Sequence, residues 1–291
     1  MVALPVRRPR PAGRFGEYAV LAPLARGGMA DVYLAVHVET GERVALKVLD
    51  AKFANQTEIT NRLFAEHQLA SSVRHPGVLE IRDARVSSDG LPYLVMEHLP
   101  GETLADLADR EPLELAEIVA IGAQVASSLA ALHAAGIIHC DVKHENVFVL
   151  PERDGIVRRV KIIDFGLSRR LGEPIDEDFS IAGTPWCMAP EQWQGRPEAA
   201  SDVYALGCLL YDLTTGVAPF DGSVPELMAA HVEQRPARPT WLAQMPPALE
   251  RLILRALAKQ PADRPSMASL ARELHALADS LAAAPELRAA G

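Results

Sequence analysis

The sequence predicts an α+β fold of two lobes, a small β-rich lobe with one main helix followed by a larger lobe built mainly of helices. Two observations carry this prediction. Strand-like apolar runs recur between residues 18 and 96, and apolar residues recur at helical spacing from Leu104 onward. A chain of 291 residues is long enough for both lobes. We therefore expect residues 15–99 to form the first lobe with its hinge and residues 100–282 the second, with tails at residues 1–14 and 283–291.

The first lobe is expected to begin as a sheet. Alternation starts near Tyr18, and the apolar runs 32–36 and 43–49 flank residues 39–42, which predict a hairpin turn. A helix is expected from about residue 57 to residue 72, because it must stop before Pro76. The apolar runs 78–81 and 93–96 would complete the sheet. The Pro- and Arg-rich residues 1–14 lack periodicity, which favours a disordered tail over a docking segment.

Helices are expected through the second lobe. Apolar residues at three- and four-residue steps from Ile118 to Leu132 predict an amphipathic helix closed by Gly136. Residues 203–213 are apolar on every side, which predicts a buried helix that ends at Gly216. Further helices are expected at about 224–234, 246–258 and 266–282.

The composition favours a soluble cytoplasmic protein. A net charge of −9 gives no electrostatic reason to bind nucleic acid or an anionic membrane, and an aromatic fraction of 5% argues against a base-stacking surface. The three cysteines lack metal-ligand spacing, which fits a reducing compartment. The longest apolar stretch, near 118–135, is interrupted by polar residues, and no secretory signal opens the chain. We expect neither a nucleic-acid partner nor a membrane partner.

Residues suited to phosphoryl transfer lie between positions 138 and 166. Asp141, Lys143 and Asn146 follow one apolar run, and Asp164 of Asp-Phe-Gly follows another. A carboxylate can accept a hydroxyl proton, a lysine can neutralise a moving phosphoryl group, and an Asn/Asp pair can hold Mg²⁺ through oxygen ligands. An Asp after a strand often caps a turn, but the whole set in register favours the chemical interpretation.

A carboxylate on the predicted helix 57–72 needs a partner. Glu66 shares a face with Leu63 and Ala70, and a charge on an apolar stripe must be paired. Lys47 is the natural partner. It shares a strand face with Ala45, so a cation for phosphates and a small residue for adenine point the same way.

The segment Ile138–Asn146 resembles the catalytic loop of eukaryotic-like (Hanks-type) protein kinases, with Cys140 in place of the usual arginine. Asp-x-Lys-x-x-Asn is the serine/threonine-type arrangement. The Gly-rich turn at 24–32, the segment 183–191 ending in Ala-Pro-Glu and the motif 263–265 also resemble that family, in family order. The resemblance covers roughly residues 16–280 and is nearest to bacterial serine/threonine protein kinases. It implies the two-lobe kinase fold, with ATP between the lobes and Ser/Thr-bearing proteins as substrates.

The resemblance also implies a role for individual residues. Asp141 would be the base, Lys143 would contact the γ-phosphate, and Thr184 would hydrogen-bond both of them. Lys47 paired with Glu66 would hold the phosphates of ATP. Asn146 and Asp164 would bind Mg²⁺, or Mn²⁺ as a possible substitute. Glu191 would pair with Arg264, and Asp202 would brace the catalytic loop. The residues expected to bind ATP are Leu24, Gly27, Gly28, Val32, Ala45, Lys47, Met96, Glu97, Leu99 and Phe148.

The chain departs from the family at two places. Ala25 and Ala30 replace the first and third glycines of the Gly-rich loop, so this turn alone fits a simple hairpin equally well. The altered loop and Cys140 support one alternative, a pseudokinase scaffold, although every catalytic residue type is present. A second alternative is a small-molecule kinase of the aminoglycoside or choline type, but those kinases lack the substrate segment 183–191.

Cys140 also carries an expectation about regulation. In kinases with arginine at this position, a phosphorylated loop residue neutralises the charge of that arginine, and cysteine has no such charge. The segment between Gly166 and Thr184 offers Ser168 and Ser180 as acceptors and carries the acidic run 176–178, either a solvated loop or a charge-paired one. We therefore expect the dephosphorylated enzyme to be active.

Overall fold

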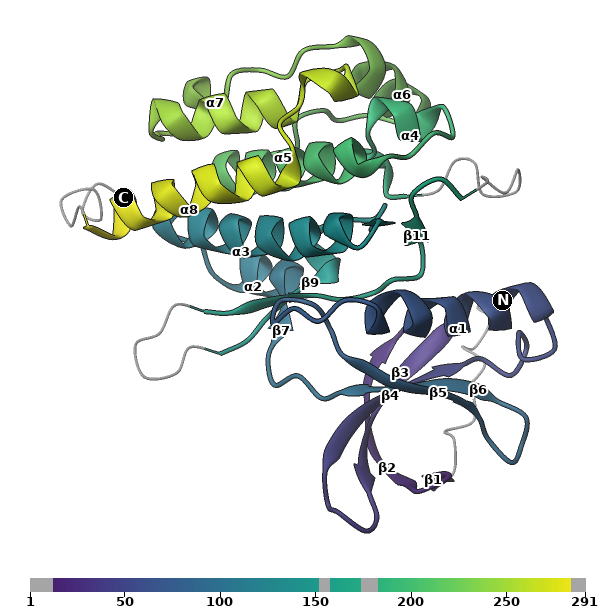
Figure 1. Ribbon diagram of the computed structural model, residues 1–291. Coiled ribbons are helices and arrows are strands. Elements are labelled where there is room, and N and C mark those ends of the chain that lie inside the picture. The colour runs from purple at the N-terminus through teal and green to yellow at the C-terminus, as the bar shows by residue number, and fades with distance from the viewer. Residues whose placement is uncertain (1–12, 152–157, 174–182, 284–291) are drawn as a thin grey trace, which may run out of the picture. The chain divides into compact units, whose positions relative to one another are not determined.

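The computed structural model describes residues 13–151, 158–173 and 183–283, which divide into two compact units (Figure 1). Unit 1 comprises Met1–Ser71 and Glu80–Leu99, and unit 2 comprises Ser72–Leu79 and Pro100–Gly291. The expected acidic run 176–178, Ser180 and most of both tails lie outside the described residues. The chain changes unit between Leu99 and Pro100, and unit 2 also takes the short segment 72–79.

The segment 72–79 corrects the sequence prediction, which placed a strand of the first lobe at 78–81. Val78 instead forms a bridge to Ile162 in unit 2, where Leu79 N donates to Ile162 O (3.0 Å) and Ile162 N donates to Gly77 O (2.8 Å). The strand of unit 1 begins at Ile81. An apolar run alone does not show which backbone will pair with it, and here the partner lies about eighty residues further along the chain.

Unit 1 is a six-stranded antiparallel sheet with one helix. The strand order is β1-β2-β3-β4-β6-β5, so the chain leaves the sheet after β4, forms α1 and returns at the edge. Gly41, in the left-handed region with φ 71°, lies in the predicted turn between β3 and β4. The sequence pattern missed the short β1, which begins within the predicted tail. The elements are β1 (Arg14–Phe15), β2 (Tyr18–Arg26), β3 (Ala30–His37), β4 (Arg43–Leu49), α1 (Thr57–Ser71), β5 (Ile81–Val86) and β6 (Pro92–Glu97).

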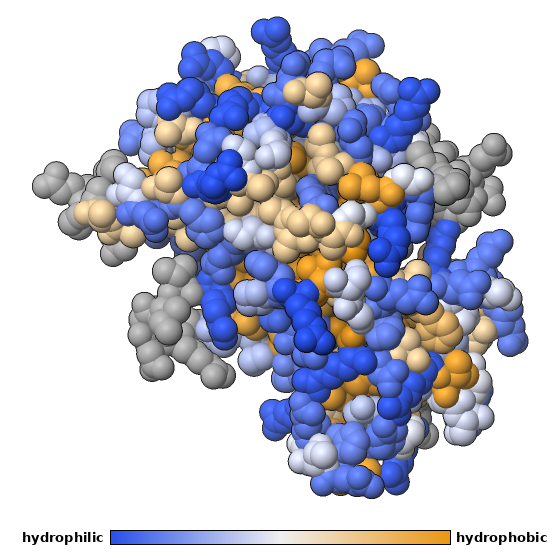
Figure 2. All heavy atoms as spheres, in the orientation of Figure 1, coloured by the Kyte–Doolittle hydropathy of each residue, from blue (hydrophilic) through white to orange (hydrophobic). Residues whose placement is uncertain are grey.

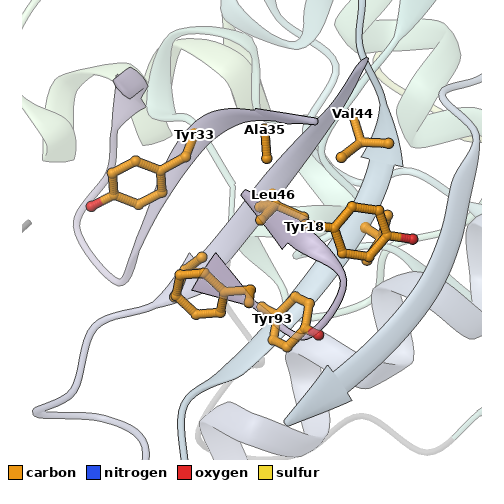
Figure 3. Close-up of a cluster of buried hydrophobic side chains, with 9 residues drawn as sticks. Tyr18, Tyr33, Ala35, Val44, Leu46 and Tyr93 are labelled. Atoms are coloured by element: carbon orange, nitrogen blue, oxygen red, sulfur yellow. The ribbon is translucent and has the colours of Figure 1, made fainter. Parts of the chain in front are cut away.

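The two faces of this sheet carry different residues. One face holds a buried apolar cluster that includes Tyr18, Leu46 and Tyr93 (Figure 3). Residues paired across an antiparallel ladder point to the same side, and β3 pairs Val32 with Lys47 while β6 pairs Met96 with Ala45. Ala45 and Lys47 are two residues apart on β4. Four of the residues predicted to bind nucleotide therefore share the face opposite the apolar cluster.

Unit 2 is mainly helical and is organised around α3 and α5, which pack against each other and against α8 and α7 (Figure 1). Residues 201–211 of α5 are all buried, which confirms the predicted core helix, and Gly216 ends it with a φ of 75°. The helices are α2 (Leu104–Arg110), α3 (Leu115–Ala134), α4 (Pro190–Trp193), α5 (Ala199–Thr215), α6 (Val224–Glu233), α7 (Pro247–Ala256) and α8 (Met267–Ala283).

Short elements between these helices carry the loops. They are β7 (Glu102–Thr103), β8 (Ile137–Ile138), β9 (Val147–Val149), β10 (Val160–Ile162), β11 (Arg169–Arg170), and the 3-10 helices η1 (His144–Asn146), η3 (Pro185–Cys187), η4 (Pro239–Trp241) and η5 (Pro261–Asp263).

Helix α3 also has the length and composition of a membrane-spanning helix. Within unit 2, however, 56% of its apolar window is buried against other parts of the protein, as is typical of a core helix. On the surface, hydrophilic side chains cover much of the face seen in Figure 2, as expected for a chain with a net charge of −9.

Candidate active site

The first part of the candidate site is an ion pair inside unit 1. Lys47 Nζ on β4 lies 2.7 Å from Glu66 Oε2 on α1, which confirms the predicted pairing. The side chain of Glu66 is 8% exposed and that of Lys47 is 19% exposed. A carboxylate buried to this extent requires a cation or donors, and Lys47 supplies both. The pair fixes the ammonium group on the sheet face that carries Val32, Ala45 and Met96.

The Gly-rich turn joins β2 to β3. Gly27 N donates to Ala30 O (3.0 Å), and a Cβ atom at Gly27 would lie 2.6 Å from that same oxygen, so glycine is required for the turn to close. A Cβ atom at Gly28 would meet nothing within 4 Å. Leu24 lies near the end of β2 and is 48% exposed. The geometry is that of a tight hairpin, which is compatible with either interpretation of the turn.

Three of the residues predicted to bind ATP, Met96, Glu97 and Leu99, lie at the end of unit 1. Met96 is buried on β6 beside Ala45. Glu97 N donates to Glu80 O (3.0 Å), and a Glu97 carboxylate oxygen accepts from Glu80 N (2.8 Å), so the Glu97 N–H is occupied within the protein. Leu99 is half-buried. In unit 2, Phe148 is half-buried on β9, where it pairs with Lys161 of β10. ATP binding by these residues stays a prediction.

The β9–β10 pairing brings two distant loops together in unit 2. Val147 pairs with Ile162, and Ile163 N donates to Asn146 O (2.9 Å). Asn146 therefore precedes one strand at the point where Asp164 follows the other. This register explains why residues 18 positions apart in sequence can act on one ligand.

Asp141 is at the centre of a hydrogen-bonded group in unit 2 and is 9% exposed. Thr184 Oγ1 donates to Asp141 Oδ1 (2.7 Å), and Lys143 Nζ lies 2.8 Å from Asp141 Oδ2. Lys143 Nζ also donates to Thr184 Oγ1 (2.9 Å), so the predicted triangle of contacts is confirmed. Burial by itself would lower the pKa of Lys143, but its hydrogen bond to Asp141 and the charges of Asp141 and Glu145 outweigh burial and raise that pKa.

Asp202 on α5 braces the loop that carries Asp141. Its two carboxylate oxygens accept from His139 N and Cys140 N, each at 2.9 Å, as predicted. Sequence reasoning missed His133 in the last turn of α3, whose Nε2 lies 2.7 Å from Asp202 Oδ2. Burial would raise the pKa of Asp202, but the hydrogen bond and charge of His133, with the charge and backbone N–H of His139, lower it. The available signal was a histidine in the last turn of a mainly apolar helix.

Glu191 and Arg264 form the predicted buried pair. Arg264 Nη1 and Nη2 donate to the two carboxylate oxygens of Glu191, at 2.6 and 2.9 Å. The other three guanidinium donors bind the backbone oxygens of Ala258, Ala200 and Lys259. All five N–H groups are thus used, which is how a buried arginine avoids a large desolvation cost. The pair holds the C-terminal end of the segment 183–191.

The oxygen atoms of Asn146 and Asp164 fit a hard divalent cation. Asn146 Nδ2 donates to Asp141 Oδ2 (3.0 Å) and Asp141 O (2.9 Å), so its amide oxygen is the atom suited to a metal. Asp164 has a left-handed φ of 65°, and its Oδ1 accepts from Gly166 N (3.2 Å). Within the described ranges no group of three or more His, Cys, Asp or Glu side chains could hold a metal ion. Two oxygen ligands suit Mg²⁺ that is also held by substrate phosphates.

Comparison with known proteins agrees with this geometry. The protein kinase domain family model matches residues 18–275, so the chain belongs to the protein kinase family. It is 38% identical over 274 residues to serine/threonine-protein kinase Pkn1 of Myxococcus xanthus, covering 92% of this chain and 39% of that protein.

Two further relatives are also bacterial serine/threonine-protein kinases. PkaA of Streptomyces coelicolor is 36% identical over 94% of this chain and 51% of its own length. PrkC of Bacillus subtilis is 35% identical over 86% of this chain and 38% of its own length. The chain thus spans about half or less of each of these relatives.

Proposed function

We propose that this protein is a Mg²⁺-dependent serine/threonine protein kinase that transfers the γ-phosphoryl group of ATP to protein substrates. The observation that carries the proposal is the group of contacts around Asp141. A buried carboxylate shares one oxygen with a threonine hydroxyl and the other with a lysine ammonium group, beside a carboxamide. Such a carboxylate can orient a substrate hydroxyl and accept its proton.

At the γ-phosphorus one bond forms and one bond breaks, and one proton is transferred. The substrate hydroxyl oxygen forms a bond to the γ-phosphorus, the bond from that phosphorus to the bridging oxygen breaks, and ADP leaves with that oxygen. The hydroxyl proton passes to an Asp141 carboxylate oxygen. Lys143, whose pKa is raised beside Asp141, stays protonated at neutral pH and stabilises charge on the transferred group. Thr184 holds Asp141 and Lys143 in their relative orientation.

Lys47 would supply a second cation for the phosphates of ATP. The Glu66 carboxylate accepts from the Lys47 ammonium group (2.7 Å) and orients it, so that a phosphate oxygen would meet a donor that is already oriented. When bound, Mg²⁺ would neutralise phosphate charge. Asn146 and Asp164 would hold it through their oxygens, with Mn²⁺ as a possible substitute. The role of Asp164 therefore differs from that of Asp141, although both are carboxylates.

The acceptor class follows from the loop and from the relatives. Asp141, Lys143 and Asn146 have the serine/threonine-type spacing, and the relatives are named serine/threonine-protein kinases. Cys140 does not weaken this proposal, because its backbone N–H keeps the hydrogen bond to Asp202. The contacts around Asp141 and the pair of Lys47 and Glu66 favour an active kinase over a pseudokinase scaffold, the alternative that the altered Gly-rich loop supports. The cysteine usage and the need for ATP support a cytoplasmic location for this domain.

The test is phosphoryl transfer from ATP to a mixed protein substrate, followed by mass-spectrometric mapping of the acceptors. We expect phosphoserine and phosphothreonine with Mg²⁺ present, and none when the metal is removed by EDTA. Asp164→Asn should show little transfer at any Mg²⁺ concentration, because a metal ligand is weakened. Nucleotide binding without transfer by the parent protein would favour the pseudokinase alternative.

A further inference from the structure

Cys140, the residue before Asp141, has a strained backbone conformation. Cys140 has a φ of 66°, which lies in the left-handed region. Among the non-glycine residues that the structure describes, only Asp164 also has a positive φ. A side chain in this region costs on the order of 1–3 kcal/mol, so the surrounding structure must hold it there. Asp202 holds the N–H side of Cys140 (2.9 Å). The carbonyl side needs a second restraint.

Gln192 supplies that restraint. It lies on α4, is 3% exposed, and its Nε2 donates to Cys140 O (3.0 Å). Its Oε1 accepts from Ala189 N (3.1 Å), at the end of the segment that begins with Gly183. The carboxamide therefore donates to a carbonyl oxygen of the catalytic loop and accepts from an N–H of the predicted substrate segment. Neither glutamate nor methionine at neutral pH could make both contacts.

The contact with Cys140 bears directly on Asp141. The Cys140 carbonyl and the Asp141 N–H belong to the same planar peptide group, so holding the oxygen also fixes the orientation of the Asp141 backbone. Asp141 N in turn donates to His139 Nδ1 (3.3 Å). If the carbonyl were released, the strained residue could rotate, and the Asp141 carboxylate would move relative to Thr184. A displacement of about 1 Å at a reacting group can cost about 10²-fold in rate.

We propose that Gln192 is a positioning residue for phosphoryl transfer, which holds the strained Cys140–Asp141 peptide and joins it to the end of the substrate segment. The proposal rests on the proposed function for its kinetic consequence. Its structural part, that Gln192 restrains this peptide, can be measured separately. Gln194, two residues further on and exposed, provides a matched control because it is the same residue type.

The first experiment compares Gln192→Met with Gln194→Met in kinetics and in hydrogen exchange. For Gln192→Met we expect kcat to fall by about 10–100-fold, with the KM for ATP changed by less than about 3-fold. Amide exchange in the peptide covering residues 139–146 should become faster, while exchange in α3 should not change. Gln194→Met should match the parent in both measurements.

The second variant, Gln192→Glu, tests the donor itself. A neutral carboxyl group can both donate and accept, whereas the carboxylate can only accept and would face the Cys140 carbonyl oxygen. The ratio of kcat for this variant to that of the parent should therefore rise as the pH is lowered, in protein shown to be folded by circular dichroism. A purely structural role would not produce this rescue.

The outcomes separate the two proposals. Faster exchange in 139–146 without any transfer by the parent would support the restraint and contradict the proposed kinase function. An active parent, with kcat and exchange unchanged in Gln192→Met, would overturn the positioning role. Loss of kcat with no change in exchange and no rescue at low pH would also overturn it.

Discussion

His231 on α6 is a buried neutral histidine, and this makes the stability of unit 2 depend on pH. Its side chain is 0% exposed, and Nδ1 lies 2.9 Å from the Tyr204 hydroxyl oxygen. Lys259 Nζ donates to the His231 backbone oxygen (2.7 Å) and places a positive charge nearby. Burial first, and the charge of Lys259 second, lower the pKa of His231 from 6.5 to about 4.

The direction of the effect follows from proton binding. Between pH 6.5 and 4 the unfolded chain binds a proton at His231 that the folded protein does not, so stability is full above 6.5 and is lost as the pH falls toward 4. The difference between the two pKa values corresponds to about 3 kcal/mol in total. Between pH 7.5 and pH 5, His231 alone should remove about 2 kcal/mol from the free energy of unfolding.

The assay is urea unfolding followed by tryptophan fluorescence. All three tryptophans, Trp186, Trp193 and Trp241, belong to unit 2, so the signal reports that unit. His231→Gln should be less stable than the parent at pH 7.5 and should lose about 2 kcal/mol less between pH 7.5 and 5. His275→Gln, which removes an exposed imidazole from α8, is the control. Equal losses of unfolding free energy in the parent and in His231→Gln would show that His231 is not the group responsible.

Three further predictions concern the ion pairs and the loop. Lys47→Met should impair kcat more than folding. Adding Glu66→Ala to this variant should lower kcat little further, because the ion pair is already broken, and additive losses in kcat would contradict the coupling. Arg264→Gln should destabilise unit 2 by about 3–5 kcal/mol in urea unfolding, since Glu191 is left as a buried unpaired charge; a loss below about 1 kcal/mol would contradict this. Phosphatase-treated enzyme should retain its activity on an external substrate, because Cys140 has no positive charge that a phosphate group would need to neutralise. A large loss of activity after phosphatase treatment would contradict this prediction.

Local sequence patterns predicted many of the helices and strands, because the periodicity of apolar residues lies within each element. The buried helix α5 was predicted because residues 203–213 are apolar on every side of a helix. The turn at Gly41 was predicted because it separates two strand patterns. The pair of Lys47 and Glu66 could also be inferred, since a charge on an apolar helix face needs a partner. In each case the information lies within one element or two.

The features that sequence reasoning missed depend on partners distant in the chain. The run at 78–81 looked like a strand of the first sheet, but Val78 pairs with Ile162. No pattern in the sequence marks Gln192, and only its buried contact with the Cys140 carbonyl oxygen indicates a role. The residue pattern within one segment predicts neither the pairing of Val78 with Ile162 nor the backbone conformation of Cys140.

If Asp141 is the base for phosphoryl transfer, the value of kcat for Asp141→Asn on a protein substrate with Mg²⁺ and ATP must show it. Asp279→Asn, which alters an exposed carboxylate on α8, is the matched control. We expect kcat to fall by about 10²–10⁴-fold for Asp141→Asn and to be unchanged for Asp279→Asn. A kcat for Asp141→Asn within about twofold of the parent would contradict it.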